Sequence, residues 1–176
     1  ARAKGIRLTN TPDVLNDDVA DLAVGLLYAT VRNMVANDRM LRAGDWARGT
    51  RPALSGRVTG RRIGILGLGR IGRAIAKRLE PVAGEIIYHN RREAADTSYR
   101  YVADPIAFAQ QSDVIIVATS GGPEAAKLVD AAMLDAFPFP FMQSMDAPAP
   151  ATSIMMTAHF LDVEHTDPEG WWWLHN

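Results

Sequence analysis

Residues 62–72 read Arg-Ile-Gly-Ile-Leu-Gly-Leu-Gly-Arg-Ile-Gly, a short apolar run that leads into three glycines at the spacing G-x-G-x-x-G. Each glycine has its own physical reason: Gly67 permits a tight turn, Gly69 lets the backbone approach a pyrophosphate, and Gly72 lets a helix pack closely on the strand. The start of that helix also offers unpaired N–H groups and partial positive charge to phosphates. The sequence therefore predicts a strand, a phosphate-binding turn and a helix. The candidate residues of this turn are Gly67, Leu68, Gly69, Arg70, Ile71 and Gly72.

Strands and helices alternate along the chain after this turn. Apolar runs predict strands at 85–89 and 113–118 and a short extended piece at 100–103. The run at 113–118 is apolar almost throughout, as expected of a strand buried on both faces. Helices are predicted at 70–80, 104–111, 124–128 and 130–136. Because such alternation implies parallel strands joined by right-handed crossovers, the expected fold is α/β, a Rossmann-type doubly wound parallel sheet.

A long amphipathic helix is predicted ahead of the glycine turn. Between residues 16 and 36 apolar side chains recur at helical spacing, and Asn16 is the expected N-terminal cap. Residues 37–61 are polar and broken by glycines and a proline, with a short helix expected at 38–43. This segment is either a solvated loop or an arm that lies against a partner subunit or over the edge of a cofactor.

Composition restricts the class of protein. The 176 residues are 48% hydrophobic, carry a net charge of −1 and include no cysteine. The near-neutral charge argues against bulk attraction to nucleic acid or membrane, and no apolar run approaches the ~20 residues that span a bilayer. Without cysteine there is no disulfide, thiol catalysis or Cys-ligated zinc, and no metal site is expected. The first residues also lack the apolar core of a secretory signal, so we expect a cytoplasmic protein.

The residues after the second strand indicate which cofactor the turn holds. An NAD site usually has Asp or Glu there, which binds the ribose hydroxyls. This chain has His89-Asn90-Arg91-Arg92 and no carboxylate. Two guanidiniums would bind a 2′-phosphate through forked, charge-assisted hydrogen bonds, and Asn90 could hydrogen-bond the ribose. We therefore predict NADP(H), with NAD(H) as the alternative if Arg91 and Arg92 are only solvated loop charges.

A polar loop follows the buried strand at 113–118. Ligands of open α/β sheets lie at the carboxyl ends of the strands, so Ser120 and Pro123 are further candidate cofactor residues. Ser120 either contacts the phosphates or ribose of the cofactor or is an ordinary exposed turn serine.

The sequence changes character after residue 136. Residues 137–141 alternate phenylalanine with proline, which removes backbone donors and excludes a central strand. Residues 1–100 carry a net charge of +8 and residues 101–176 one of −9, and no arginine follows Arg100. A doubly wound sheet needs another strand here, but the pattern offers no good candidate. Residues 137–176 are therefore expected to form an atypical tail, either disordered or altered by a shift of the reading frame.

Several motifs, in order along the chain, resemble the D-isomer-specific 2-hydroxyacid dehydrogenase family. They are Asn10-Thr11-Pro12-Asp13-Val14-Leu15, Gly44-Asp45-Trp46, the glycine turn, Tyr88-His89-Asn90-Arg91-Arg92 and Gly121-Gly122-Pro123-Glu124. The similarity runs from residue 1 to about 136 and is strongest to the NADPH-dependent glyoxylate/hydroxypyruvate reductase branch. It implies a homodimer built on the long helix and the arm, and hydride transfer to a small 2-keto acid. It also divides the chain into a remnant of the substrate domain (1–12), an NAD(P)-binding domain (13–136) and the tail (137–176), with the substrate domain largely missing.

The resemblance identifies catalytic groups that this sequence lacks. The family anchors the substrate carboxylate with an Arg after the next strand. Here Lys127 is the only lysine or arginine after Arg100, and its point charge does not make a forked contact with a carboxylate. The phrase Met156-Thr157-Ala158-His159 resembles the one that carries the family's acid. His159 is therefore the single catalytic candidate, the alternative being an incidental tail histidine. Three hypotheses follow: a reductase, an inactive NADP(H)-binding or dimerisation module, and the product of a reading-frame change near Phe137.

Overall fold

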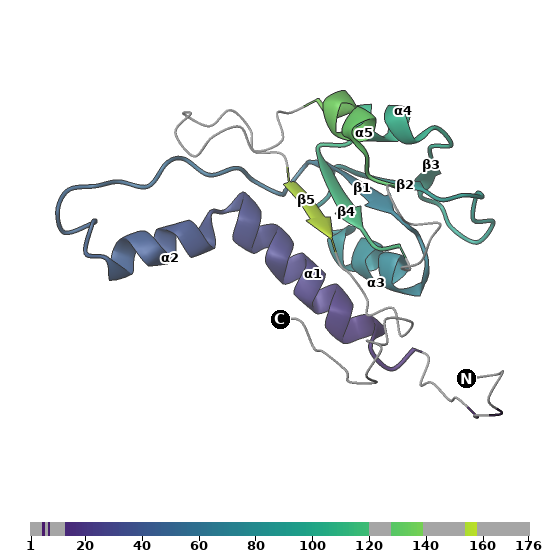
Figure 1. Cartoon of the computed structure of the whole chain (residues 1–176), viewed down its shortest axis with the longest axis horizontal. Coiled ribbons are helices and arrows are strands. Elements are labelled where there is room, and N and C mark those ends of the chain that lie inside the picture. Colours follow the sequence, from purple (N-terminus) through teal and green to yellow (C-terminus); the bar gives the residue numbers. More distant parts are fainter. Residues whose placement is uncertain (1–4, 6, 8–12, 120–127, 139–153, 158–176) are drawn as a thin grey trace.

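The computed structural model describes residues 5, 7, 13–119 and 128–138, together with the backbone of 154–157. Five strands form one parallel sheet in the order β3-β2-β1-β4-β5 (Figure 1), which confirms the predicted α/β, Rossmann-type fold. The strands are β1 (Arg62–Leu66), β2 (Glu85–His89), β3 (Arg100–Tyr101), β4 (Val114–Val117) and β5 (Ile154–Thr157). The helices are α1 (Asn16–Val31), α2 (Met34–Arg42), α3 (Arg70–Leu79), α4 (Pro105–Gln110) and α5 (Ala131–Ala136).

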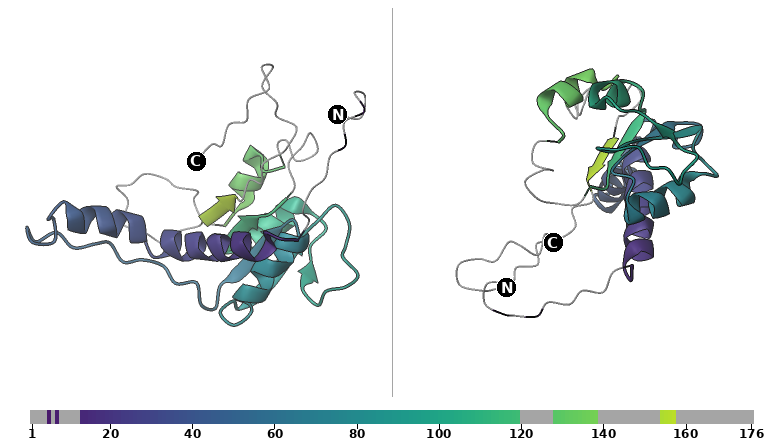
Figure 2. Two further views of the ribbon diagram at one scale, coloured as in Figure 1. Left: turned by 90° about the horizontal axis from the view of Figure 1, so that it is seen from below. Right: turned by 90° about the vertical axis from the view of Figure 1, so that its right-hand side faces the viewer.

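Helices cover both faces of the sheet (Figure 2). On one face, Ile63, Ile65 and Ile116 pack with the buried sides of α1 and α3. On the other face, Leu66 and Ile115 pack with α4 and α5. Successive strand residues point to opposite faces, so a strand covered on both sides must be apolar at every position, as β4 is.

Gly64 in the middle of β1 lets α4 approach the sheet. A Cβ at this position would lie 2.3 Å from Ser112 Oγ and 2.7 Å from the Phe108 ring. The buried Ser112 hydroxyl is satisfied because it donates to the Phe108 carbonyl at 2.7 Å. A side chain on Gly64 would therefore push α4 off the sheet.

The long predicted helix differs from expectation at both ends. Asn16 does not cap it: Leu15 occupies the cap position without a side-chain bond, and the Asn16 amide donates to Asp13 Oδ1 at 2.9 Å. At the other end the helix stops at Val31, five residues early, because Asn33 adopts left-handed backbone angles with φ of 52°. Asparagine is one of the few residues that tolerate this conformation, so the chain bends there.

The chain after the bend projects from the sheet as α2 and an arm, residues 43–61 (Figure 1). The helix in this segment spans Met34–Arg42 and so starts four residues before the predicted 38–43. The last part of the arm, before β1, is attached to the rest of the chain. Arg32 Nη1 donates to the Gly56 carbonyl at 3.1 Å, and the Val58 side chain is buried. No single helix in the described ranges is long and apolar enough to cross a membrane, although α1 and α2 taken together across their 62° bend pass the same test.

The strand β5 corrects the expectation that residues 137–176 hold no strand. It runs parallel to β4, with Ile154 opposite Val114 and Thr157 opposite Val117. It is only four residues long and half of it is methionine, so it is too short to show a clear strand period in the sequence. The strand with which β5 pairs, β4, is also distant in the sequence, so this pairing depends on the tertiary fold and not on local sequence. The other residues of the tail and nearly all of the helix expected at 124–128 lie outside the described residues.

Candidate functional site: the carboxyl edge of the sheet

The glycine turn lies at the point where the order of the sheet reverses. It connects the end of β1 to the start of α3, and β1 is flanked by β2 on one side and β4 on the other. In open α/β sheets this reversal leaves a crevice at the carboxyl ends of the strands, which is where their ligands bind. The residues that follow β1, β2 and β4 therefore form the candidate site.

The three glycines meet three different environments. Gly67 has φ of 101°, and a Cβ there would lie 2.8 Å from the backbone of Ala118, just after β4. A Cβ on Gly72 would lie 2.2 Å from the Gly67 carbonyl oxygen, so the first turn of α3 packs directly on the loop. At Gly69 the same Cβ meets no described atom within 4 Å. Two glycines thus build the turn, whereas Gly69 is exposed and leaves its backbone accessible.

Asn90 ties the turn to the end of β2. Its side-chain Oδ1 accepts the Leu68 N–H at 2.7 Å, and next to it the Gly67 N–H donates to the His89 carbonyl at 3.0 Å. The amide oxygen of Asn90 thus fixes the loop, and a hydrogen bond from this side chain to a ribose stays a prediction. The Leu68 side chain is buried in the core and the half-buried Ile71 packs against it, so both side chains contribute to packing.

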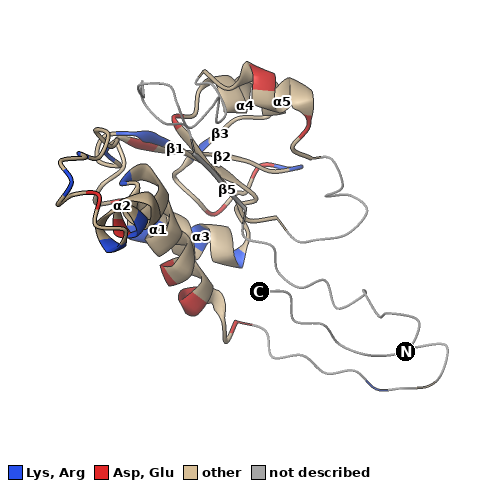
Figure 3. Ribbon diagram, turned by 60° about the vertical axis from the view of Figure 1, so that its left-hand side comes forward, with Lys and Arg blue, Asp and Glu red and all other residues tan. Residues whose placement is uncertain are grey.

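Arg70 is the charged residue of the turn. It is exposed and pairs with Asp13, the residue shortly before α1, at 3.1 Å. At the far end of α3, Arg78 pairs with Asp17 and Asp21 at 2.9 Å and 2.5 Å. Figure 3 shows acidic positions on the first turns of α1 and basic ones on the neighbouring α3. An anion at the turn would therefore compete with Asp13 for the Arg70 guanidinium.

The loop that follows β2 places Arg91 and Arg92 on the surface. No carboxylate occupies the end of β2, and the first acidic residue of the loop is Glu93. The loop is also attached at several points: Tyr101 Oη donates to the Asn90 carbonyl at 3.0 Å, Tyr88 Oη accepts the Ala94 N–H at 3.0 Å, and Arg73 pairs with Asp96 at 2.6 Å. The sequence interpretation assigned no role to either tyrosine, because the neighbouring sequence does not show which groups their hydroxyls contact.

Thr119 closes the site on the β4 side. Its Cγ2 would lie 2.9 Å from a Cβ on Gly67, so the end of β4 and the glycine turn are in direct contact. The candidates Ser120 and Pro123 on the same loop, and His159 two residues after β5, lie outside the described residues.

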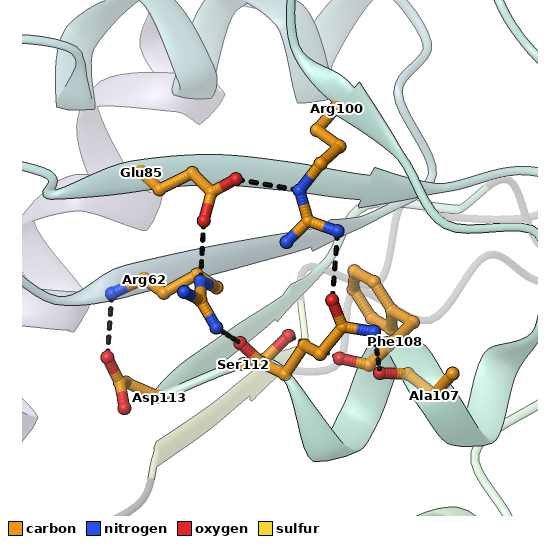
Figure 4. A network of polar contacts seen from close by, with 8 residues as sticks. Arg62, Glu85, Arg100, Ala107, Phe108, Ser112 and Asp113 are labelled. Carbon is orange, nitrogen blue, oxygen red and sulfur yellow. Dashed lines mark hydrogen bonds and ion pairs between the residues drawn. The ribbon is translucent and has the colours of Figure 1, made fainter.

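A second polar network lies at the opposite, amino-terminal edge of the sheet (Figure 4). Glu85 accepts from Arg100 Nε at 2.7 Å and from Arg62 Nε at 2.6 Å. Mainly through the Arg100 contact, and further through Arg62, these guanidiniums lower the pKa of the Glu85 carboxyl despite the opposing effect of its partial burial. The Arg62 backbone N–H donates to Asp113 Oδ2 at 2.7 Å. The network joins the starts of β1, β2, β3 and β4 and lies away from the crevice.

Fold and turn together define the dinucleotide-binding domain of a dehydrogenase. A family profile for the "D-isomer specific 2-hydroxyacid dehydrogenase, NAD binding domain" matches residues 24–139. The chain belongs to this family.

Individual relatives agree with this assignment. The chain is 44% identical over 135 residues to glyoxylate/hydroxypyruvate reductase A HPR2 of Arabidopsis thaliana, covering 77% of this chain and 43% of the relative. Hydroxyphenylpyruvate reductase of Plectranthus scutellarioides is 42% identical, with coverages of 76% and 42%. Among solved structures, the NADPH-dependent glyoxylate/hydroxypyruvate reductase of Sinorhizobium meliloti in complex with NADP and malonate superposes with a TM-score of 0.70, at 43% identity and coverages of 77% and 43%. The chain thus spans less than half the length of these relatives and matches their cofactor-binding part.

Proposed function

We propose that this chain is the NADP(H)-binding part of a reductase that acts on small 2-keto acids of the glyoxylate or hydroxypyruvate type. The observation that carries the proposal is the end of β2, where two exposed arginines follow Asn90, which bonds to the glycine turn, and the usual carboxylate is missing. A carboxylate would repel a 2′-phosphate, whereas guanidiniums bind it. The backbone at Gly69 and the start of α3 would hold the pyrophosphate.

The relatives support the substrate class. Two of the three relatives are named for glyoxylate and hydroxypyruvate and the third for hydroxyphenylpyruvate, and the Sinorhizobium meliloti structure holds NADP with malonate, a small dicarboxylate. When bound, NADPH would supply the hydride that reduces the keto carbon. The residues of this chain would contribute binding and orientation: the turn holds the cofactor, and Asn90 keeps the turn in place through Leu68.

A second candidate function is an NADP(H)-binding or dimerisation module without turnover. It is favoured by the absence of any arginine after Arg100, since a forked carboxylate anchor is what the substrate would need. Assaying NADPH oxidation with glyoxylate and with hydroxypyruvate separates the two functions. An ordinary enzymatic rate rules out the inactive module, and tight NADPH binding without turnover rules out the active reductase.

The cofactor preference is tested by fluorescence titration of the full chain with NADPH and NADH. We expect Arg91→Ala and Arg92→Ala each to weaken NADPH binding about tenfold to a hundredfold, the range for losing hydrogen bonds to a charged group, and to change NADH binding little. Arg39→Ala, at an exposed position on α2, is the matched control and should leave both affinities unchanged. Equal weakening of NADPH and NADH by the Arg91 and Arg92 variants would contradict the proposal.

Pairing of two copies and a cytoplasmic location belong to the same proposal. Pairing is supported by large apolar side chains that stand exposed along α1, α2 and the arm: Leu22, Leu26, Met34, Val35, Leu41, Trp46 and Leu54. Exposed apolar side chains gathered on one projecting part of a molecule are typical of an interface.

A further inference from the structure

We propose that the hydroxyls of Tyr88 and Tyr101 are positioning groups that hold the Arg91–Arg92 segment in place and thereby set the preference for a 2′-phosphorylated cofactor. The inference rests on the proposed function. Its structural basis is the loop between β2 and β3, which is exposed at Arg91 and Arg92 but attached to the protein on both sides of them.

Tyr101 holds the loop just before the arginines. Its hydroxyl, carried on β3, donates to the Asn90 carbonyl at 3.0 Å. The Asn90 side chain in turn accepts the Leu68 N–H of the glycine turn at 2.7 Å. A single residue thus connects the proposed pyrophosphate site to the proposed 2′-phosphate site, and Tyr101 fixes its backbone.

Tyr88 holds the loop just after the arginines. Its hydroxyl accepts the Ala94 N–H at 3.0 Å and lies 3.4 Å from the Ala94 carbonyl, to which it donates. The Tyr88 side chain is only 1% exposed, so the core fixes the ring and the hydroxyl has a defined place. The two tyrosine rings also contact each other, with centroids 5.3 Å apart.

A third attachment holds the outer part of the loop. Arg73 on α3 pairs with Asp96 at 2.6 Å and donates to its backbone carbonyl at 3.2 Å. The arginine pair is therefore presented by a backbone that is bound at Asn90, Ala94 and Asp96. Binding costs less when the groups that contact the ligand are ordered beforehand, because less conformational entropy is lost on association.

This arrangement predicts an effect on specificity as well as on affinity. Only NADP(H) carries the phosphate that the arginines would contact, so a looser loop weakens NADPH and leaves NADH nearly unchanged. We expect Tyr88→Phe and Tyr101→Phe each to lower NADPH affinity about three- to tenfold, the loss that one hydrogen bond represents, and to change NADH affinity less than about twofold. Because no charge is removed, the salt dependence of NADPH binding should stay as in the parent chain.

Tyr99→Phe is the matched control. Tyr99 is near the same loop, but its hydroxyl donates to the Glu80 carboxylate at 2.5 Å and touches neither the Asn90 nor the Ala94 backbone. Partial burial, together with the bond to Glu80, raises the pKa of Tyr99 to about 12, so this hydroxyl stays protonated at neutral pH. The control should keep the ratio of NADPH to NADH affinity of the parent chain.

The experiment is a titration of the full chain and the three variants with NADPH, NADH and adenosine 2′-monophosphate, after circular dichroism has confirmed that each folds. Weaker binding of NADPH and of the 2′-monophosphate in both Tyr88→Phe and Tyr101→Phe, with NADH retained, supports the inference. If Tyr88→Phe fails to fold, the half-buried Tyr101 decides alone. An unchanged affinity ratio overturns the inference while the proposed function stands. A parent chain without NADPH preference overturns the proposed function first and the inference with it.

Discussion

Gly69 and Gly72 are three residues apart, yet a methyl group would meet very different surroundings at each. At Gly72 it would lie 2.2 Å from the Gly67 carbonyl oxygen, inside the contact that seats α3 on the loop. At Gly69 it would point into space that no described atom fills within 4 Å. The first position serves packing, and the second fits the close approach of a ligand to the backbone.

These two positions give a paired prediction. Gly72→Ala should lower the free energy of unfolding by about 1–3 kcal/mol, because the neighbouring backbone oxygen must move. Gly69→Ala should leave stability within about 0.5 kcal/mol and weaken NADPH binding. Urea denaturation and NADPH titration measure the two quantities. Retained NADPH affinity in Gly69→Ala would mean that the pyrophosphate does not approach this residue.

At the scale of elements, the hydrogen bonds and ion pairs around Glu85 connect the first residues of neighbouring strands. Arg62 on β1 and Arg100 on β3 both donate to this carboxylate on β2. Their contacts lower the pKa of Glu85 in the folded chain. A carboxyl whose pKa is lower in the folded than in the unfolded state stabilises the fold above its ordinary pKa of 4.5, and this stabilisation is lost as the pH falls further.

Glu85→Gln should therefore lower the free energy of unfolding at pH 7 by about 0.5–1 kcal/mol, a range reduced because the ion pairs are partly exposed. The difference between the variant and the parent should shrink below pH 4.5, where the parent carboxyl also becomes neutral. Urea denaturation at pH 7, 4.5 and 3 measures it. Glu93→Gln, at an exposed loop position, is the control. A difference that stays constant down to pH 3 would disprove the role of the Glu85 charge.

Elements specified by local signals were predicted from the sequence. The strand at 85–89 has the predicted bounds, and the strand at 62–66 leads into the glycine turn as predicted. The helices α4 and α5 start where Asp104 and Asp130 cap them, through bonds to Ala107 N at 2.6 Å and Met133 N at 2.9 Å. The bend at Asn33 and the strand β5 could not be predicted, because the first depends on one backbone conformation and the second on a partner distant in the chain.

In the candidate site, too, the features that depend on local sequence were predicted and those that depend on distant residues were not. The glycine spacing and the missing carboxylate after β2 are local patterns, and they placed the site at the carboxyl edge of the sheet. The bond from Asn90 to Leu68, the two tyrosine contacts and the need for Gly64 are long-range. They depend on which strand lies beside which, so the spacing of residues along the chain does not reveal them.

At the scale of the whole molecule, α1 lies against the sheet while α2 and the arm extend away from it (Figure 1), and all three expose apolar side chains. On α1, Leu22 and Leu26 are 63% and 47% exposed, on a side of the helix next to the one that carries the buried Ala23 and Leu27. A second copy that covers this surface would remove it from water at roughly 25 cal/mol per Å². The exposed apolar surface of α1, α2 and the arm is therefore the expected interface between two copies.

The double variant Leu22→Glu with Leu26→Glu should convert a dimer into a monomer, because each buried carboxylate would be expensive to desolvate. Light scattering coupled to size-exclusion chromatography measures the mass. Lys77→Glu, at an exposed position on α3, is the control and should leave the dimer intact. A parent chain that is already monomeric at micromolar concentration would remove this surface as the interface.

The pairing of β5 with β4 has a consequence for handling the protein. Every residue of Val114–Val117 is buried and apolar, and β5 occupies the hydrogen-bonding side of this strand that β1 does not. Without β5, β4 would be an exposed edge strand. Its four adjacent apolar residues and unpaired backbone groups could then pair with another extended chain. Shortening the chain after residue 138 to obtain a neater cofactor domain should therefore favour aggregation during expression, so the residues after 138 are best kept in any recombinant version of the protein.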